Sequence, residues 1–252
     1  MKALVATILV LVSSLISLAG TRNPSVPDEK YIKYGEDFHY VLHICGVSKD
    51  NSLFCGSSVV INPRWILTAA HVVKDSKHCG VHTKNGVVIV SKSFIHEDYD
   101  NKFGVGDIAL CSLKQDIELD FYPDLYDKDD EVGKVCCISG YGISGTFITG
   151  EEKSDGQRRA GSNKIDQVIH DLLICTPSKS QRDGLTALEF LISSGDSGGG
   201  LFIDGKLAGI NSCVMAVSRS PSSKYGEESG HTRISKFIPW IKKIIASEST
   251  EE

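Results

Sequence analysis

Apolar residues recur along this chain in short runs, and Gly, Asn, Asp or Ser separates one run from the next. Examples from residue 40 onward are YVLHI, SSVVI, WILTAA, DIALCSL and LFIDGKLAGI. Short runs rich in Val, Ile, Phe and Tyr, with turn residues between them, are typical of strands in a barrel or sandwich. Asp204-Gly205, between two apolar flanks, predicts a two-residue hairpin turn. The pattern therefore predicts an all-β protein.

The last apolar segment, KFIPWIKKIIAS, has a different period. Its large apolar residues recur at helical spacing, and Lys242 and Lys243 fall on the opposite face. The apolar face consists of Phe237, Trp240, Ile241, Ile244 and Ile245. This spacing predicts a C-terminal helix over residues 237–247 that packs on a barrel.

Two polar stretches lack apolar periodicity and are predicted to be loops. Residues 121–133 are suited to join two halves of the molecule. Residues 149–164 are charged and contain glycine, which favours a surface loop, although Arg158-Arg159 within them is also the kind of pair at which chains are processed.

The first nineteen residues, MKALVATILVLVSSLISLA, combine Lys2, a long apolar run and the small residues Ser17 and Ala19. This is the pattern of a secretory signal peptide cleaved near Ala19, although an uncleaved membrane anchor is the alternative. We expect an exported protein, extracellular or, in a bacterium, periplasmic, with no membrane segment after signal removal.

Charge and cysteine content narrow the classes of partner. The formal net charge is −5, and loss of Lys2 makes it −6, so the chain lacks the cationic excess that nucleic-acid binding requires. Eight cysteines in an exported chain allow up to four disulfides.

The groups KHCGVH and FHYVLHIC contain His and Cys but lack the paired spacing of a zinc site, so we predict no metal and no cofactor. We expect a monomer.

The segment GDSGGG combines one acid and one hydroxyl with bare backbone. A nucleophile in acyl transfer needs an unobstructed approach and backbone N–H groups aimed at the developing oxyanion. Glycines around Ser197 meet both needs, with the amides of Gly195 and Ser197 as the oxyanion hole and the Ser197 hydroxyl as the nucleophile.

A serine hydroxyl requires a base, and the base requires an anion to orient it. His71 ends WILTAAH, where small residues leave its imidazole accessible at a strand end. Asp107 opens the apolar run DIALCSL. These two residues are the candidates for base and orienting acid.

Together NPRWILTAAH, GDIALCSL and GDSGGG resemble the motifs of trypsin-like (chymotrypsin-fold) serine peptidases, as do CGSSVVINPRW, FIHEDYD, CISGYG and FIPWI. The resemblance implies two six-stranded antiparallel β-barrels with a C-terminal helix and the site in the cleft between them. The implied boundaries are a signal peptide at 1–19, a leader or propeptide at 20–30 and a peptidase domain at 31–247, with barrels over about 31–120 and 134–236.

By the same resemblance the chain is a secreted serine endopeptidase that hydrolyses proteins or peptides through an acyl-enzyme. Ser197 is the nucleophile, His71 the base and then acid, and Asp107 its orienting partner. Ser212, Val214 and Leu191 would bind substrate, and Leu191 at the pocket base implies a small or apolar residue before the cleaved bond. The alternative is a peptidase-like binding or regulatory protein without turnover.

The chain departs from the family at two points. The family's new N-terminus buries its ammonium against the aspartate before the nucleophile, here Asp196, and counting back from Cys55 places that terminus near Tyr31. Most of the family's disulfide positions lack cysteine here. The resemblance leaves Cys55 with Cys79 as the expected bridge and gives Cys45 no partner.

Overall fold

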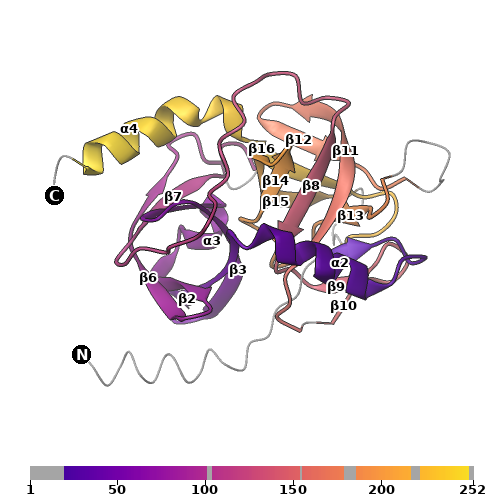
Figure 1. The fold of residues 1–252 in the computed structure, drawn as a ribbon, viewed down its shortest axis with the longest axis horizontal. Coiled ribbons are helices and arrows are strands. Elements are labelled where there is room, and N and C mark those ends of the chain that lie inside the picture. The colour runs from indigo at the N-terminus through magenta and orange to yellow at the C-terminus, as the bar shows by residue number, and fades with distance from the viewer. Residues whose placement is uncertain (1–19, 101–103, 154, 179–185, 217–221, 250–252) are drawn as a thin grey trace.

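The computed structural model describes residues 20–100, 104–153, 155–178, 186–216 and 222–249. Two closed six-stranded barrels lie next to each other, as the resemblance implied (Figure 1). The first barrel has the strand order β2-β3-β4-β7-β6-β5. Its strands are β2 (Val41–Ser48), β3 (Leu53–Asn62), β4 (Trp65–Thr68), β5 (Ser76–Thr83), β6 (Gly86–Ile95) and β7 (Ala109–Leu113).

The second barrel has the order β11-β12-β16-β15-β14-β8, and every pair of neighbours is antiparallel. Its strands are β8 (Val135–Gly140), β11 (Arg159–Ile169), β12 (Leu172–Cys175), β14 (Gly200–Ile203), β15 (Lys206–Met215) and β16 (Glu228–Arg233). The predicted Asp204-Gly205 turn joins β14 to β15, with positive φ at both residues, as a turn of this type requires.

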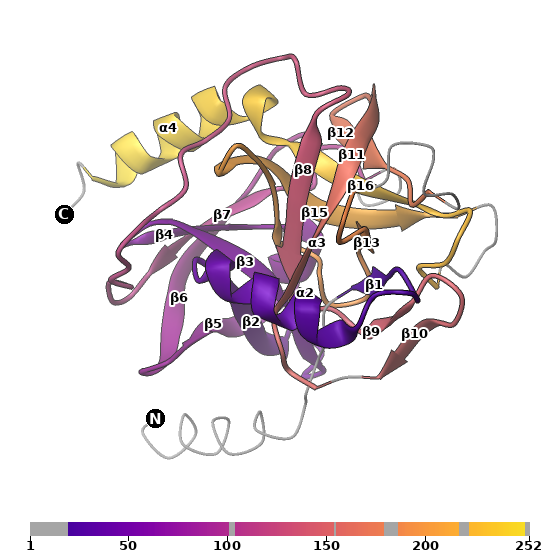
Figure 2. The ribbon, with the colours of Figure 1, turned by 45° about the vertical axis from the view of Figure 1, so that its right-hand side comes forward.

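A small four-stranded sheet lies beside the second barrel (Figure 2). It consists of β1 (Thr21–Arg22), β9 (Ser144–Thr146), β10 (Gly150–Lys153) and β13 (Phe190–Leu191). The strand β1 runs parallel to β9 and antiparallel to β13. This pairing fastens the start of the described chain to the segment that precedes the candidate nucleophile.

The helices are short apart from the last one. They are α2 (Asp28–Gly35), η1 (Glu36–Phe38), α3 (Ala70–Val73), η2 (Ile234–Lys236) and α4 (Ile238–Glu248). The predicted C-terminal helix is present as α4, and it buries Ile241 while Lys242 and Lys243 stay exposed. The sequence pattern did not indicate α2, because eight residues give little periodic signal and its fully buried residue Tyr31 packs on distant elements.

The prediction of a loop over residues 149–164 was wrong. Residues 150–153 form β10, and β11 begins at Arg159. The Arg159 guanidinium is buried, pairing with Asp28 of α2 and Asp155. A buried cation requires such partners. Asp155 is only four residues away, but Asp28 comes from a helix over a hundred residues away, so the local composition gave no signal of that pairing.

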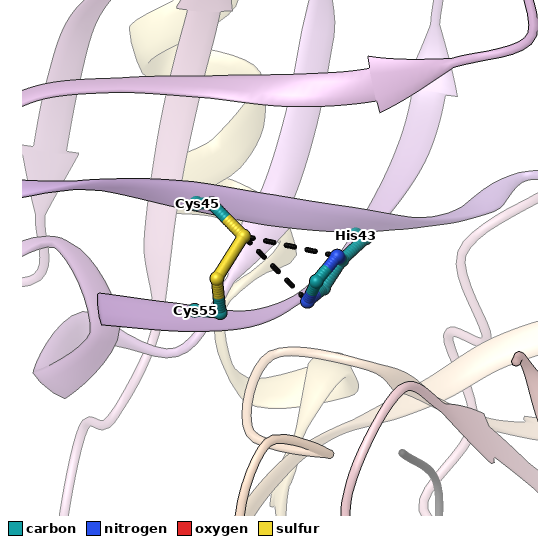
Figure 3. A group of neighbouring side chains, drawn as sticks. All are labelled: His43, Cys45 and Cys55. Atoms are coloured by element: carbon teal, nitrogen blue, oxygen red, sulfur yellow. Dashed lines mark hydrogen bonds between the residues drawn. A yellow bond between two sulfur atoms is a disulfide. The ribbon is translucent and has the colours of Figure 1, made fainter. Parts of the chain in front are cut away.

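The expected disulfide is also corrected. Cys45 bonds Cys55, and Cys79 is a buried free thiol. Strand β2 lies between β3 and β5 in the barrel, so Cys45 is directly opposite Cys55, whereas Cys79 is opposite Gly46 on the other neighbouring strand. In Figure 3 the bridge joins the two adjacent strands with the His43 ring beside it.

Among the described residues, helix length and hydropathy together yield no candidate membrane span. The predicted signal segment lies outside the described residues.

Candidate active site

His71 and Asp107 meet through two hydrogen bonds. The helix α3 begins just before His71, so the His71 backbone amide points at Asp107 and donates to its Oδ1 at 2.9 Å. The ring atom Nδ1 lies 2.7 Å from Asp107 Oδ2. Since an ionised carboxylate only accepts, Nδ1 carries the proton and Nε2 is left as the acceptor. This is the tautomer that a general base requires.

Asp107 is almost completely buried, with 3% of its side chain exposed, whereas 32% of the His71 side chain is exposed. Ser212 Oγ donates to Asp107 Oδ2 at 2.6 Å. Burial opposes ionisation of Asp107, but the hydrogen bond and charge of His71, with the Ser212 hydrogen bond, outweigh it and hold the carboxyl pKa below its ordinary value. The site therefore keeps a buried anion behind a partly exposed imidazole.

Ser197 lies in the loop between β13 and β14, which packs on the segment leading to His71. The Ser57 amide donates to Ser197 O at 2.8 Å. A Cβ at Gly198 would overlap Ser57 O and Thr68 Oγ1. Gly198 also has a φ of +87°, which favours glycine. The bare backbone of GDSGGG thus lets the second barrel's loop approach the first barrel closely.

The amides of Gly195 and Ser197 have no hydrogen-bond acceptor within the described part of the chain, whereas the carbonyls attached to the same peptide groups are held. Ile143 N donates to Ser194 O at 2.7 Å, and Gly199 N donates to Asp196 O at 2.9 Å. Because N–H and C=O point in opposite directions across a trans peptide, holding each carbonyl turns its amide the other way. Two neighbouring unpaired donors suit a developing oxyanion.

Asp196 is fully buried and surrounded by neutral donors. Gly142 N donates to Oδ1 at 2.8 Å, while Ser193 N and Gly20 N donate to Oδ2 at 2.8 and 2.9 Å. Burial raises the Asp196 pKa to about 6, although the donated hydrogen bonds oppose the rise. Among these donors, only Gly20 comes from the start of the chain.

The structure places Gly20, and not Tyr31, against Asp196. Tyr31 lies within α2, fully buried, and its hydroxyl donates to Glu189 O at 3.0 Å. Gly20 has a φ of +58°, and a Cβ there would overlap the Phe190 ring, so the position accepts only glycine without rearrangement.

A cavity of about 250 Å³ opens beside Ser197. Ser212 and Val214 line it, as two of the predicted substrate-binding residues, but Leu191 does not. Leu191 is fully buried, and its backbone pairs with Thr21 of β1. The lining is mainly hydroxyl-bearing, with one carboxylate, and consists of Glu151, Ile192, Ser193, Ser194, Ser197, Ser212, Cys213, Val214 and Ser223.

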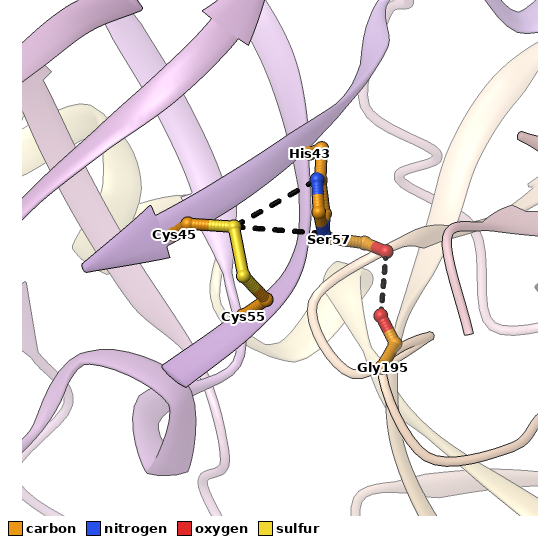
Figure 4. The surroundings of a disulfide bond; sticks show 5 residues. All are labelled: His43, Cys45, Cys55, Ser57 and Gly195. Atoms are coloured by element: carbon orange, nitrogen blue, oxygen red, sulfur yellow. Dashed lines mark hydrogen bonds between the residues drawn. A yellow bond between two sulfur atoms is a disulfide. The ribbon is translucent and has the colours of Figure 1, made fainter. Parts of the chain in front are cut away.

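The disulfide adjoins the site through Ser57 (Figure 4). Ser57 Oγ donates to Gly195 O at 2.9 Å and accepts from Tyr141 N at 2.9 Å. His43 has its ring nitrogens 3.6 and 3.7 Å from Cys45 Sγ, and burial with the nearby His82 lowers its pKa to about 4. His43, Cys45 and Cys55 are grouped closely enough for a metal, but the two bonded sulfurs are not thiolates, the form of cysteine that binds metals.

The sequence interpretation did not identify several residues that shape the site. Ser57, Ser193 and Glu151 were missed because each is one serine or acid in an unremarkable stretch. Glu151 accepts from Ser194 N at 2.7 Å across a loop. Gly20 had one available signal, its place directly after the predicted cleavage at Ala19.

Comparisons with known proteins show the family of the chain. A family model described as Trypsin matches residues 36–241. Human kallikrein-4 is 26% identical over 214 residues, covering 78% of this chain and 79% of that protein. Mouse mast cell protease 8 is 30% identical over 207 residues, covering 71% and 76%. Chymotrypsin from Phaedon cochleariae is 27% identical over 225 residues, covering 81% and 76%.

Solved structures share the fold at lower identity. HL collagenase superposes with a TM-score of 0.67 at 18% identity, over 83% of this chain and 94% of that one. Neuropsin, a serine protease expressed in the limbic system of mouse brain, gives 0.63 at 22% identity, over 89% and 98%.

Proposed function

This chain belongs to the trypsin family and is a serine-type endopeptidase, and we propose that Ser197, His71 and Asp107 are its catalytic triad. The observation that carries this proposal is the double hydrogen bond from His71 to the buried Asp107. Ser212 connects the halves of the site, because it hydrogen-bonds Asp107 and lines the same cavity as Ser197.

In the proposed mechanism Ser197 Oγ attacks the carbonyl of a bound peptide while His71 Nε2 takes its proton. Asp107 keeps the imidazole oriented and stabilises the imidazolium. The amides of Gly195 and Ser197 donate hydrogen bonds to the negatively charged oxygen of the tetrahedral intermediate. His71 then protonates the leaving amine as the peptide C–N bond breaks, which leaves the acyl-enzyme. Water next attacks the acyl carbonyl while His71 takes its proton, and His71 returns that proton to Ser197 Oγ as the ester bond breaks and the acid product leaves.

We propose that the cavity beside Ser197 takes a small or apolar residue before the cleaved bond. Its modest volume and the apolar groups of Ile192 and Val214 support this preference. Cleavage of a peptide library diversified at that position tests it. Preference for Arg or Lys would refute it and would direct attention to Glu151, the carboxylate of the lining.

We propose secretion with removal of residues 1–19. Cleavage after Ala19 would make Gly20 the first residue, and the Gly20 nitrogen is 2.9 Å from Asp196 Oδ2. A free ammonium there would neutralise the buried carboxylate, as the family's N-terminus does. N-terminal sequencing of the secreted protein tests this. A chain that begins at Tyr31 would contradict it and would support a propeptide at 20–30.

A fluorophosphonate probe tests the triad itself. We expect it to label the wild type, and Ser91→Ala as a control at an exposed serine, but to leave Ser197→Ala unlabelled. Hydrolysis of a casein substrate should follow the same order. A folded wild type that neither labels nor hydrolyses would favour a binding protein that has kept the scaffold without turnover.

A further inference from the structure

Behind the nucleophile loop lies a buried polar pair that the triad does not use. Asn211 of β15 and His231 of β16 are directly opposite each other, and both are fully buried. His231 Nδ1 is 2.9 Å from Asn211 Oδ1, and His231 Nε2 is 2.9 Å from Ser229 Oγ. A buried amide and imidazole are costly unless every polar atom is paired. Their hydrogen bonds reach the loop that carries Ser197.

The Asn211 amide group faces two carbonyls. Asn211 Nδ2 is 3.2 Å from Asp196 O and 3.1 Å from Ser139 O, and both oxygens can only accept. The NH₂ group must therefore lie on that side, which leaves Oδ1 facing His231. His231 must then donate from Nδ1, which leaves Nε2 of the neutral imidazole as an acceptor. The Ser229 hydroxyl supplies the donor, since its contact with Nε2 at 2.9 Å is shorter than its 3.3 Å contact with Cys175 O. Burial, which lowers the His231 pKa to about 3, is consistent with that form.

The backbone of Asn211 holds the same loop. Asn211 N donates to Gly199 O, and Asn211 O accepts from Gly198 N, each at 2.8 Å. With the side-chain contact to Asp196, Asn211 thus holds the chain on both sides of Ser197, at Asp196 before it and at Gly198 and Gly199 after it.

The contact to Asp196 O has a direct geometric consequence for the oxyanion hole. Asp196 O and Ser197 N belong to one peptide group, and the described residues contain no cis peptide bond. A donor behind the carbonyl therefore directs Ser197 N–H forward, toward the position of the oxyanion. The Gly195 amide is fixed by main chain alone, through Ile143 N and Ser194 O, whereas Asp196 O accepts from the Asn211 side chain as well as from Gly199 N. Only the Ser197 donor has a side chain holding its peptide.

We propose that Asn211, oriented by His231, is a positioning residue that keeps the Ser197 amide aimed at the oxyanion. This inference rests on the proposed function. Neither residue lines the substrate cavity, so we expect substrate to contact neither of them. The effect of the pair should therefore fall on the transition state and leave ground-state binding intact.

The test uses the full secreted protein and two variants that remove the contact by different routes. Asn211→Leu has nearly the same shape and lacks the NH₂ group. His231→Leu keeps Asn211 but leaves its Oδ1 unpaired. We expect kcat to fall roughly 10²-fold to 10³-fold for Asn211→Leu, the range for loss of one oxyanion donor, and less for His231→Leu. KM should change less than threefold, and affinity for a peptide aldehyde inhibitor, which forms a tetrahedral adduct, should fall in parallel with kcat.

His231→Gln can still donate to Asn211 Oδ1 and should retain most of the activity, which a packing role would not predict. Ile210→Val is the matched control, because Ile210 is the buried neighbour of Asn211 on β15. It should lower the melting temperature with kcat unchanged. If Asn211→Leu does not fold, the comparison of His231→Leu with His231→Gln decides.

The inference is overturned if the folded variants keep kcat within threefold of the wild type, or if kcat falls only in proportion to the folded fraction. Either result, with an active wild type, leaves the proposed triad intact. A wild type that is inactive and is not labelled by the fluorophosphonate probe would instead contradict the proposed function.

Discussion

Asp107, just before the first barrel's β7, and Asp196, just before the second barrel's β14, are both buried, but their carboxyl pKa values move in opposite directions. Asp107 faces an imidazole and a hydroxyl, and its pKa is lowered. Asp196 faces backbone amides and one hydroxyl, and its pKa is raised to about 6. Burial raises both, so the difference lies in the partner. Asp107 is therefore stabilised as an anion by its partners, whereas a nearby cation would be required to stabilise ionised Asp196 to the same degree.

The largest effect is expected at the first barrel's acid. Asp107→Asn should lower kcat by roughly 10⁴-fold, because an amide in place of the carboxylate favours the wrong tautomer of His71. Peptide hydrolysis at saturating substrate measures it. Circular dichroism should show a folded protein, and Asp116→Asn, at an exposed aspartate, is the control. A loss below tenfold would contradict the assigned role.

The second effect concerns the cation that Asp196 lacks. Protein made with Ala19 retained before Gly20 has no ammonium at Asp196. We expect its kcat/KM to be lower by on the order of 10²-fold than that of protein beginning at Gly20, since an unpaired buried charge costs about 3 kcal/mol or more. Equal activity of the two forms, both verified by mass spectrometry, would show that the hydrogen bonds to Asp196 suffice.

The same two forms should differ in how stability depends on pH. In the form that retains Ala19, the folded Asp196 has a raised pKa and binds its proton more tightly than the unfolded chain. The contribution of Asp196 to stability should therefore be greatest below about pH 4 and fall by about 3 kcal/mol as pH rises through 6. Urea unfolding at pH 4 to 7 measures this change.

Two comparisons isolate Asp196 in that measurement. Asp196→Asn should remove this component of the pH dependence, and a free Gly20 ammonium should remove or reverse it. Identical pH profiles for the two N-terminal forms would mean that Gly20 does not pair with Asp196.

The smallest effect is expected at the hydroxyl that supports Asp107. Ser212→Ala removes one hydrogen bond to a buried carboxylate, and such bonds contribute about 1.5 kcal/mol or more, equivalent to roughly tenfold in kcat/KM. A pH profile of kcat/KM separates this loss from a change in substrate binding. Loss of the Ser212 hydrogen bond should raise the Asp107 pKa and so shift the acidic limb of the profile toward higher pH. An unshifted limb would assign Ser212 to the substrate cavity alone.

The sequence predicted an all-β chain and named candidates for the site's chemical groups, but it missed β10 and the start of β11. Short apolar runs separated by turn residues, the Asp204-Gly205 turn and the helical spacing after Phe237 are local signals, and the strands, turn and helix that they predicted are present. The short stretches around His71, Asp107 and Ser197 were enough to identify the candidate catalytic residues. Each catalytic role requires a particular residue type, and the residues next to it in sequence make it accessible.

Strand neighbours were decided only by the tertiary structure. Cys45 bonds Cys55, and Cys79 stays a free thiol, because β2 lies between β3 and β5. Arg159 begins a strand because Asp28 and Asp155 neutralise it. Asn211 meets His231 through the register of β15 on β16, and Gly20 reaches Asp196 through the pairing of β1 with β13. The physical reason is common to all four: a residue type and its neighbours are written in contiguous sequence, whereas these partners come from strands or a helix that only the fold brings together.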